Sequence, residues 1–251
     1  AGHLYNLLAY SYFWNAENDE EYNKGLQYIE KYIELNPNEA NAYDSLAEFH
    51  LNKGEFDLAI ENYQLAFEVD PEFEWATRNL ALAKYQEKMS SEDAKVMNWT
   101  SESEEARNAF NIGMWQLYNL EWEQAGQSFS SAIELDESFA LAYAMRARTN
   151  YFLQNQGKVA EDLEIAVSMS INASPEEKKM IMALSNDNNL GTNSFNQVVE
   201  RLVRKYPDSS FLRFETIFAT INDIGPDMIL RRGKDLIEMN PNFTPALNIM
   251  G

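Results

Sequence analysis

The chain has 251 residues, with 20 lysines and arginines against 40 aspartates and glutamates, so its formal net charge is −20. An apolar fraction of 45 % is that of a folded protein, and the lack of cysteine excludes disulfides, thiolate metal sites and cysteine nucleophiles. The negative charge argues against nucleic-acid partners and anionic membranes, which require excess lysine and arginine, and no apolar run is long enough to span a bilayer.

The first predicted element is a helical hairpin over residues 2–37. Leu8, Ala9 and Tyr12 lie on one face of its first helix, and the second helix ends at Pro37. The turn between the two helices, around the sequence NAENDEE, is longer than in the hairpins that follow.

Residues 40–73 give the clearest hairpin. Small and apolar residues recur every three or four positions on each of two helices, which predicts one buried stripe per helix. Gly54 falls in the turn between them, where a left-handed backbone costs glycine little, and Pro71 ends the second helix. The stripe residues are Tyr43, Leu46, Ala47, His50, Phe56, Ala59, Tyr63 and Ala66.

The rest of the chain repeats this pattern with decreasing clarity. Residues 74–88 supply one helix, residues 89–100 break the pattern, and the capping-box sequence Ser101-x-x-Glu104 marks a new start. A good hairpin at 106–139 precedes a weaker one at 140–170 that holds Tyr143, Ala147, Ala160 and Ala166. Three further segments follow: a hairpin opened by the capping box Ser174–Glu177 and ending at Pro207, a hairpin at 210–242, and the start of a helix at 244–251.

The 40–73 unit resembles the tetratricopeptide repeat (TPR), whose pattern of about 34 residues is W-x2-L-G-x2-Y, then A-x3-F, then P. Ala47 and His50 depart from the glycine and the tyrosine of that pattern. The resemblance implies an all-α, right-handed α-α superhelix of about six helix-turn-helix repeats plus partial ones. We expect an N-terminal array at 1–88, a linker or insertion at 89–100, and a C-terminal array at 101–251 with degenerate repeats and a truncated last repeat.

In the TPR family the first helix of each repeat lines a concave groove, and the second helix lies on the outer face. The resemblance therefore implies a non-enzymatic scaffold that binds a peptide or helix of a partner protein in this groove. The predicted groove residues combine aromatic, amide and charged side chains. They are Asn6, Tyr10, Phe13, Trp14, Asn41, Asp44, Glu48, Trp75, Arg78, Tyr85, Phe110, Met114, Tyr118 and Arg148.

Charge and the chain ends bear on the partner. Residues 1–175 carry a net charge of −19 and residues 176–251 only −1. The acidic part either attracts a basic protein partner or is a solvated surface that keeps the protein soluble. The first helix is apolar and aromatic almost all round, and the last one is cut short, so either the chain is a fragment of a longer array or its uncapped ends allow self-association.

No catalytic or metal-binding motif is present, so we expect no enzyme activity, no cofactor and no metal site. The two histidines are isolated, and the acidic loops lack the spacing of a calcium loop. The alternative function is a sensory or ligand-binding helical module with an aromatic pocket for a small molecule or glycan. The expected compartment is the cytoplasm, although a chain that starts at Ala1 leaves a removed signal peptide open.

Overall fold

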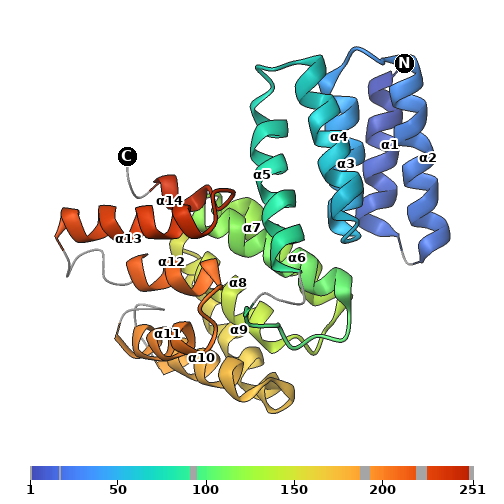
Figure 1. The fold of residues 1–251 in the computed structure, drawn as a ribbon. Helices are drawn as coiled ribbons and strands as arrows, with labels where there is room; N and C mark the ends of the chain where they lie inside the picture. The colour runs from blue at the N-terminus through green and yellow to red at the C-terminus, as the bar shows by residue number, and fades with distance from the viewer. Residues whose placement is uncertain (1, 17, 91–94, 187–192, 219–224, 249–251) are drawn as a thin grey trace. The chain divides into compact units, whose positions relative to one another are not determined.

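The computed structural model describes residues 2–16, 18–90, 95–186, 193–218 and 225–248, in two compact units (Figure 1). Unit 1 is residues 1–87 and unit 2 is residues 88–251. In the described ranges every regular element is a helix and there is no strand, so the all-α prediction is confirmed.

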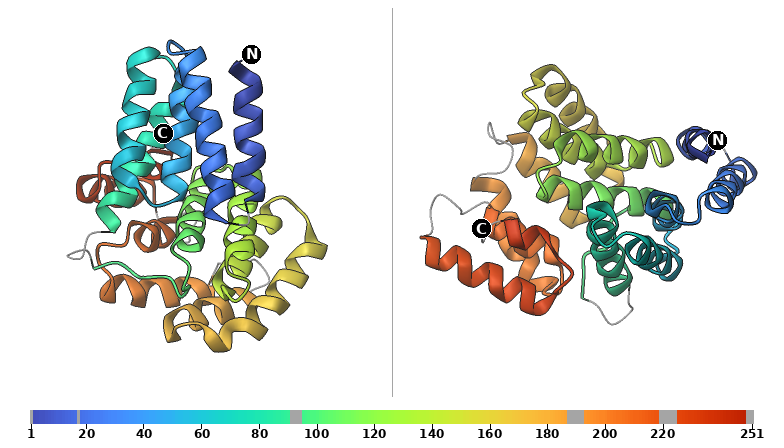
Figure 2. Two further views of the ribbon diagram at one scale, coloured as in Figure 1. Left: turned by 90° about the vertical axis from the view of Figure 1, so that its right-hand side faces the viewer. Right: turned by 90° about the horizontal axis from the view of Figure 1, so that it is seen from above.

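Unit 1 contains two helical hairpins and a single helix. α1 (Gly2–Asn15) pairs with α2 (Asp19–Leu35), α3 (Ala40–Asn52) pairs with α4 (Phe56–Val69), and α5 (Glu74–Met89) follows. Figures 1 and 2 show these helices running side by side along a common direction. Short connections between antiparallel helices produce this arrangement because each hairpin buries its stripe against its own partner and the next hairpin.

The core of unit 1 combines alanines with larger apolar residues where the helices pack together. Ala9 of α1, Ile29 of α2 and Phe49 of α3 form one buried cluster. Ala40, Ala66 and Ala76 form another, which packs α5 against the second hairpin. The alanines at these close approaches are therefore as predicted from the spacing of the 40–73 unit.

The same backbone hydrogen bonds recur at corresponding positions of successive hairpins. The amide of Glu55 donates to the carbonyl of His50, and 66 positions later that of Glu121 donates to Gln116 (both 2.9 Å). Gly54, before this amide, has a φ of 77°, in the left-handed region that glycine favours. Leu120 and Gln154 take the same place in the hairpins that follow, with φ of 64° and 59°, so the turn geometry is kept even where the residue is unfavourable for it.

In its described residues, unit 2 contains four more hairpins and a short last helix. Their helices are α6 (Glu104–Tyr118), α7 (Trp122–Leu135), α8 (Ala140–Phe152), α9 (Gln156–Met169), α10 (Pro175–Asn186), α11 (Asn193–Lys205), α12 (Ser210–Phe218), α13 (Pro226–Met239) and α14 (Pro245–Asn248). A 3₁₀ turn, Ser170–Asn172, joins α9 to α10. The helix predicted over 244–251 is present as α14, and residues 249–251 lie outside the described residues.

Two details of the predicted helices differ from expectation. The N-cap of α6 is Ser103, whose hydroxyl accepts from the amide of Ala106 (3.0 Å), whereas Ser101 donates to Asp136 instead. The predicted capping box at 101–104 is therefore wrong by two residues. Ala160 is exposed, because Val159 takes the buried position facing the partner helix.

The capping box that opens α10 is present. The Ser174 hydroxyl accepts from the amide of Glu177 (3.2 Å), and the Glu177 carboxylate accepts from the amide of Ser174 (3.0 Å). This reciprocal pair satisfies two helix-end donors.

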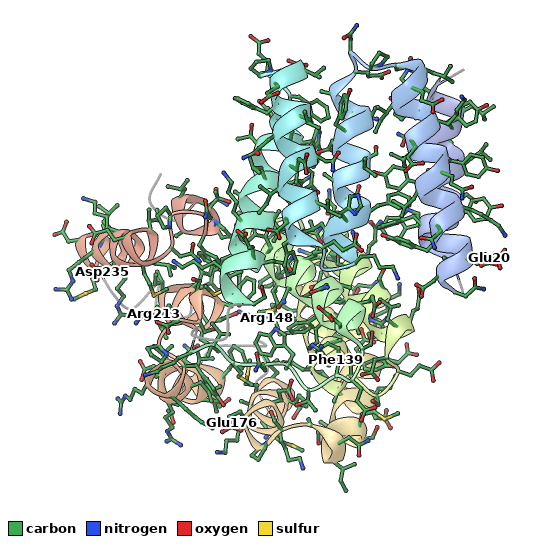
Figure 3. All side chains as sticks on the ribbon, turned by 45° about the vertical axis from the view of Figure 1, so that its right-hand side comes forward. Glu20, Phe139, Arg148, Glu176, Arg213 and Asp235 are labelled. Atoms are coloured by element: carbon green, nitrogen blue, oxygen red, sulfur yellow. The ribbon has the colours of Figure 1, made fainter. Side chains whose placement is uncertain are left out.

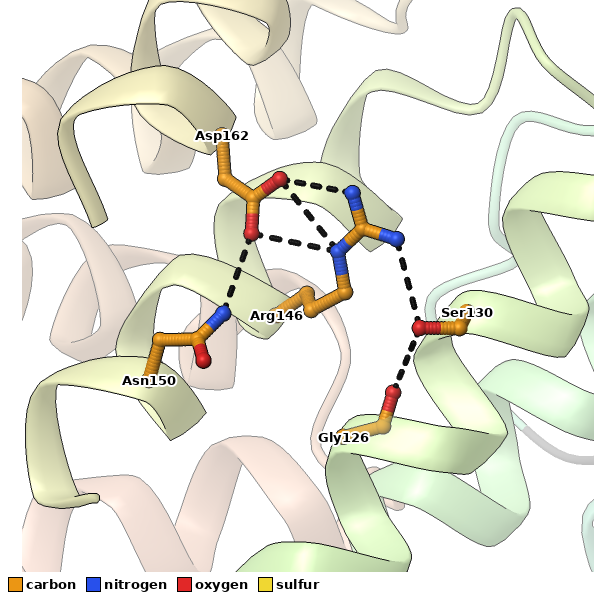
Figure 4. Close-up of polar contacts among 5 residues, drawn as sticks. All are labelled: Gly126, Ser130, Arg146, Asn150 and Asp162. Atoms are coloured by element: carbon orange, nitrogen blue, oxygen red, sulfur yellow. Dashed lines mark hydrogen bonds and ion pairs between the residues drawn. The ribbon is translucent and has the colours of Figure 1, made fainter. Parts of the chain in front are cut away.

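A polar network joins α7, α8 and α9 (Figure 4). Arg146 of α8 donates to both carboxylate oxygens of Asp162 on α9 (2.6 and 3.1 Å) and to the hydroxyl of Ser130 on α7 (3.2 Å). Asn150 donates to the same carboxylate (3.2 Å). Because Asp162 is buried, these bonds supply the pairing that a buried charge requires and fix the packing of one hairpin on the next.

Helix contact is also close between α6 and α7. A β-carbon added to Gly113 of α6 would lie 2.8 Å from ring atoms of Phe129 on α7. The position thus requires glycine for space and not for backbone freedom.

Candidate functional site

The fourteen predicted groove residues fall into two groups that differ in exposure. Four lie in unit 2, and all four are buried: Phe110, Met114, Tyr118 and Arg148. The other ten lie in unit 1, where Asp44 and Tyr85 are buried, Trp14 and Trp75 are exposed, and the remaining six are intermediate. Only unit 1 therefore presents predicted groove residues to solvent.

In unit 2 the predicted groove residue Arg148 is part of an internal ion pair. Arg148 of α8 makes two bonds to the carboxylate of Glu215 on α12, one of them at 3.0 Å, and the Tyr118 hydroxyl of α6 donates to the same carboxylate (2.5 Å). The side chains of Arg148 and Glu215 are 2 % and 1 % exposed, and Figure 3 labels the position of Arg148. Burial by itself would lower the pKa of Arg148, but the charge of Glu215, its hydrogen bond and the contribution of Tyr118 together outweigh burial, so the pKa is raised and the side chain stays cationic.

Aromatic side chains fill the space around this pair. Tyr118 packs on Phe211 and Phe214 of α12, with ring centroids 5.7 and 4.7 Å apart, and Trp115 packs on Phe243 at 5.6 Å. Helix α12 and the turn before α14 therefore cover the inner side of α6 and α8.

The segment before α6 covers another part of the same surface. Trp99 is buried, its ring lies 5.0 Å from that of Phe110, and its indole donates to Asn111 of α6 (2.7 Å). The amide of Thr100 donates to Glu177 of α10 (2.7 Å). Residues 95–100 belong to the segment 89–100 that was expected to be a linker or insertion, and they form no helix but pack against α6 and α10 of unit 2.

In unit 1 two tryptophans are more than half exposed, one on the first helix of the first hairpin and one on the single helix α5. Trp14 of α1 is 54 % exposed and Trp75 of α5 is 52 % exposed. Trp14 packs edge-on against Phe13 (4.7 Å between centroids), and the guanidinium of Arg78 lies 4.7 Å from the centre of the Trp75 ring. These neighbours restrain both indoles, and a restrained, exposed aromatic loses little entropy when a partner binds it.

The polar residues of the same helices converge on one another. The Tyr10 hydroxyl of α1 donates to Glu48 of α3 (2.5 Å) and lies 3.5 Å from the hydroxyl of Ser45. The Asn79 amide of α5 donates to the carboxylate of Asp44 (3.5 Å). We call this group, with one residue of α4, the acidic cluster: Tyr10, Asp44, Ser45, Glu48, Tyr63 and Asn79.

The carboxylates of the acidic cluster have no cationic partner among the described residues. Burial, reinforced by the charge of Glu48, raises the pKa of Asp44 to about 7, although the bond from Asn79 opposes the shift. Burial also raises the pKa of Glu48, against the opposing bond from Tyr10. Near neutral pH the cluster thus holds two carboxyl groups whose negative charge no cation among the described residues compensates.

Tyr63 belongs to this cluster, and sequence reasoning placed it only in the packing stripe. Its side chain is fully buried, and its hydroxyl has no hydrogen-bond partner among the described residues. Burial raises the pKa of Tyr63, and the charges of Asp44, Glu48 and Tyr10 raise it further, so the hydroxyl lies within electrostatic range of these groups. The sequence did contain a signal for this position, namely a tyrosine in a predicted buried stripe. A buried phenol ordinarily needs a hydrogen-bond partner, so polar groups are expected nearby.

The remaining predicted residues take supporting positions. Asn41 donates to the Tyr32 hydroxyl (3.3 Å), Phe13 packs on the buried Phe49, and Asn6 has a buried amide oxygen with no partner among the described residues.

The part of the chain that the structure describes also bears on metal binding and on membrane insertion. No three histidine, aspartate or glutamate side chains there could hold a metal ion. No helix there has the length and apolar character needed to cross a membrane.

Comparisons with known proteins were made by sequence and by structure. Residues 28–61 match the model of the tetratricopeptide repeat family. The sequence matches none of the curated proteins with which it was compared.

Among solved structures, the chain is similar to the pilF protein of Pseudomonas aeruginosa, with 18 % identity, a TM-score of 0.35, and 84 % of this chain and 95 % of that one covered. It is similar to a thermophilic TPR protein of Thermus thermophilus, with 15 % identity, a TM-score of 0.33, and 99 % and 100 % covered. It is also similar to the C-terminal part of a TPR repeat-containing protein of Cytophaga hutchinsonii, with 17 % identity, a TM-score of 0.31, and 100 % and 88 % covered.

The family match spans the turn from α2 to α3 and most of the 40–73 hairpin. The turn bonds and the left-handed turn residue of that hairpin recur in the hairpins that follow it in unit 2. Residues 28–61 thus match the tetratricopeptide repeat family, and the turn geometry of this segment recurs in two hairpins of unit 2.

Proposed function

We propose that the chain is a protein-interaction scaffold that binds a segment of a partner protein on the first helices of unit 1, α1, α3 and α5. The observation that carries this proposal is the contrast between the units. In unit 1, Trp14 and Trp75 remain half exposed, whereas the predicted groove residues of unit 2 are covered by α12 and by residues 95–100. Tryptophans held in place at a surface are the residues that most often dominate binding energy at protein interfaces.

The inner surface of unit 2 supports a different role. Its groove positions make internal hydrogen bonds and aromatic contacts, and a partner would have to displace them. We infer that unit 2 acts as a rigid support, and that binding takes place on unit 1.

The experiment is selection from a phage-displayed library of random linear peptides on the immobilised chain. The wild type is expected to enrich binding peptides, and the double variant Trp14→Ala/Trp75→Ala is expected to weaken the selected peptides by at least about tenfold, since hot-spot truncations cost about 2 kcal/mol or more. The matched control is Leu58→Ala/Phe67→Ala, which removes two exposed apolar side chains from the second helix α4.

The position of the bound peptide is then mapped with a photoreactive group in the peptide. Crosslinks on α1, α3 or α5 are expected. Failure to enrich any peptide, or equal loss of binding in the α4 control, would contradict the proposal.

A further inference from the structure

The acidic cluster of unit 1 has an arrangement that packing alone does not require. Asp44 is 8 % exposed, and the partners of Asp44 and Glu48 among the described residues are Asn79 and Tyr10, neither of them a lysine or arginine. A buried carboxylate without a counter-charge destabilises a fold unless it is protonated or a cation is supplied.

A separate observation points to a missing donor. The Tyr63 hydroxyl is fully buried beside both carboxylates, yet it has no hydrogen-bond partner among the described residues. Tyr63 lies on α4, whereas the two acids lie one turn apart on α3. The unpaired hydroxyl is therefore an observation separate from the burial of the acids. From α1 the Tyr10 hydroxyl donates to the carboxylate of Glu48.

The acidic cluster therefore has more hydrogen-bond acceptors than donors directed at them. Two carboxyl groups and a phenol oxygen offer several acceptor positions, whereas the described residues donate to the two carboxylates through one phenol and one amide. A group with several N–H donors and a positive charge would correct both the hydrogen bonding and the charge. Ammonium and guanidinium groups have this chemistry.

We propose that the acidic cluster binds the positively charged end of a lysine or arginine side chain that the partner segment presents. This rests on the proposed function, because the segment bound on α1, α3 and α5 carries the cation. The cationic group replaces the proton on Asp44, donates to Asp44 and Glu48, and uses the Tyr63 hydroxyl as a further acceptor.

The charge of the surroundings agrees with this assignment. Unit 1 contains 17 acidic and 5 basic residues, a net charge of −12, so its field attracts a basic segment before contact. The groups that face Asp44 are Glu48 on its own helix, Tyr10 on α1, Tyr63 on α4 and the neutral Asn79 on α5. None of them is a cation that would compete with the ligand.

The test uses the peptides that the full-length chain selects from the random library. If the inference is right, lysine or arginine is enriched at one aligned position, and replacing it by norleucine weakens binding to the wild type by at least about tenfold. The same replacement should have little effect on binding to the variant Asp44→Asn/Glu48→Gln. The matched control Glu61→Gln/Glu68→Gln makes the same change in net charge on exposed positions of α4 and should behave like the wild type.

A second variant guards against loss of folding. Tyr63→Phe removes a hydroxyl that makes no hydrogen bond, so the free chain should keep its melting temperature while affinity for the selected peptide falls several-fold. Calorimetry in buffers of different ionisation enthalpy should also show release of a proton when the peptide binds at neutral pH, and no release with Asp44→Asn.

The outcomes separate the two proposals. Selected peptides without enrichment of lysine or arginine would overturn the assignment of the acidic cluster and leave the scaffold function in place. If the norleucine peptide loses as much affinity for Asp44→Asn/Glu48→Gln as for the wild type, the cation binds elsewhere on the chain. That result would also overturn the assignment of the acidic cluster. A chain that selects no peptide would overturn both.

Discussion

The buried pair of Arg148 and Glu215 gives a large and specific prediction for unit 2. Replacing Arg148 by methionine keeps the length of the side chain but leaves the Glu215 carboxylate buried, with the Tyr118 hydroxyl as its remaining partner. Breaking a buried pair by removing one member costs about 3–5 kcal/mol, which is a large fraction of the stability of an ordinary domain. With a urea m-value of about 2 kcal/mol per molar, the unfolding midpoint of unit 2 should fall by roughly 2 M.

The double variant Arg148→Met/Glu215→Gln identifies the cause of that loss. Glutamine is neutral, has nearly the same shape and can still accept from Tyr118. It should therefore recover at least about half of the cost of Arg148→Met. If the double variant is as unstable as the sum of the two single variants, the penalty does not come from an unpaired charge and the reasoning is refuted.

Tryptophan fluorescence can follow unit 2 alone. Replacing Trp14 and Trp75 by phenylalanine leaves Trp99, Trp115 and Trp122, all of them in unit 2. Separate observation of the unit is needed because an array of repeats need not unfold in one step. A midpoint that moves by less than about 0.3 M in Arg148→Met would contradict a stabilising role for the pair.

Three further predictions concern packing, pH and self-association. Gly113→Ala should destabilise unit 2 by about 1–3 kcal/mol because the new methyl group overlaps an aromatic ring, whereas Gly157→Ala, where nothing lies within 4 Å, should be neutral or stabilising; urea titration compares them. Burial and a neighbouring carboxylate raise the pKa of Asp44 to about 7, so the folded chain keeps a proton that the unfolded chain loses above about pH 4. The free energy of unfolding should therefore fall as the pH rises from about 4 to 7. The same pH series measured on Asp44→Asn should show a smaller fall. We also propose that the exposed Leu4 and Leu7 of α1 support self-association, and Leu4→Glu/Leu7→Glu should then remove any concentration-dependent dimer in sedimentation velocity, while a wild type that stays monomeric at high concentration would contradict the idea.

The helical hairpins could be predicted from the sequence because their signals are local. The spacing of Ala47, Ala59 and Ala66 fixes where the helices of one hairpin meet, and all three are fully buried. Gly54 marks the turn, and its backbone is left-handed as expected. Each hairpin contacts mainly its neighbours, so a pattern of about 34 residues contains most of the information needed to specify the fold.

The contents of the groove could not be predicted in the same way, since they depend on contacts between distant parts of the chain. Arg148 was expected to face a partner, but its partner is Glu215, 67 residues later. Phe110 was expected to lie in an open groove, and Trp99 covers it. Position within a repeat predicts which face a side chain is on, but not whether another segment of the same chain already occupies that face.

Corresponding positions of the repeats show how one architecture yields two kinds of surface. The fifth and ninth residues of the hairpin at 40–73 are Asp44 and Glu48, and those of the hairpin at 106–139 are Phe110 and Met114. An apolar pair is stabilised by burial, so unit 2 can cover it with its own aromatic residues at a net gain. An acidic pair gains nothing from apolar cover and needs a cation, which unit 1 does not supply from its described residues. The same backbone positions thus favour self-packing in unit 2, and in unit 1 they leave the acidic pair for which we propose an external, positively charged group.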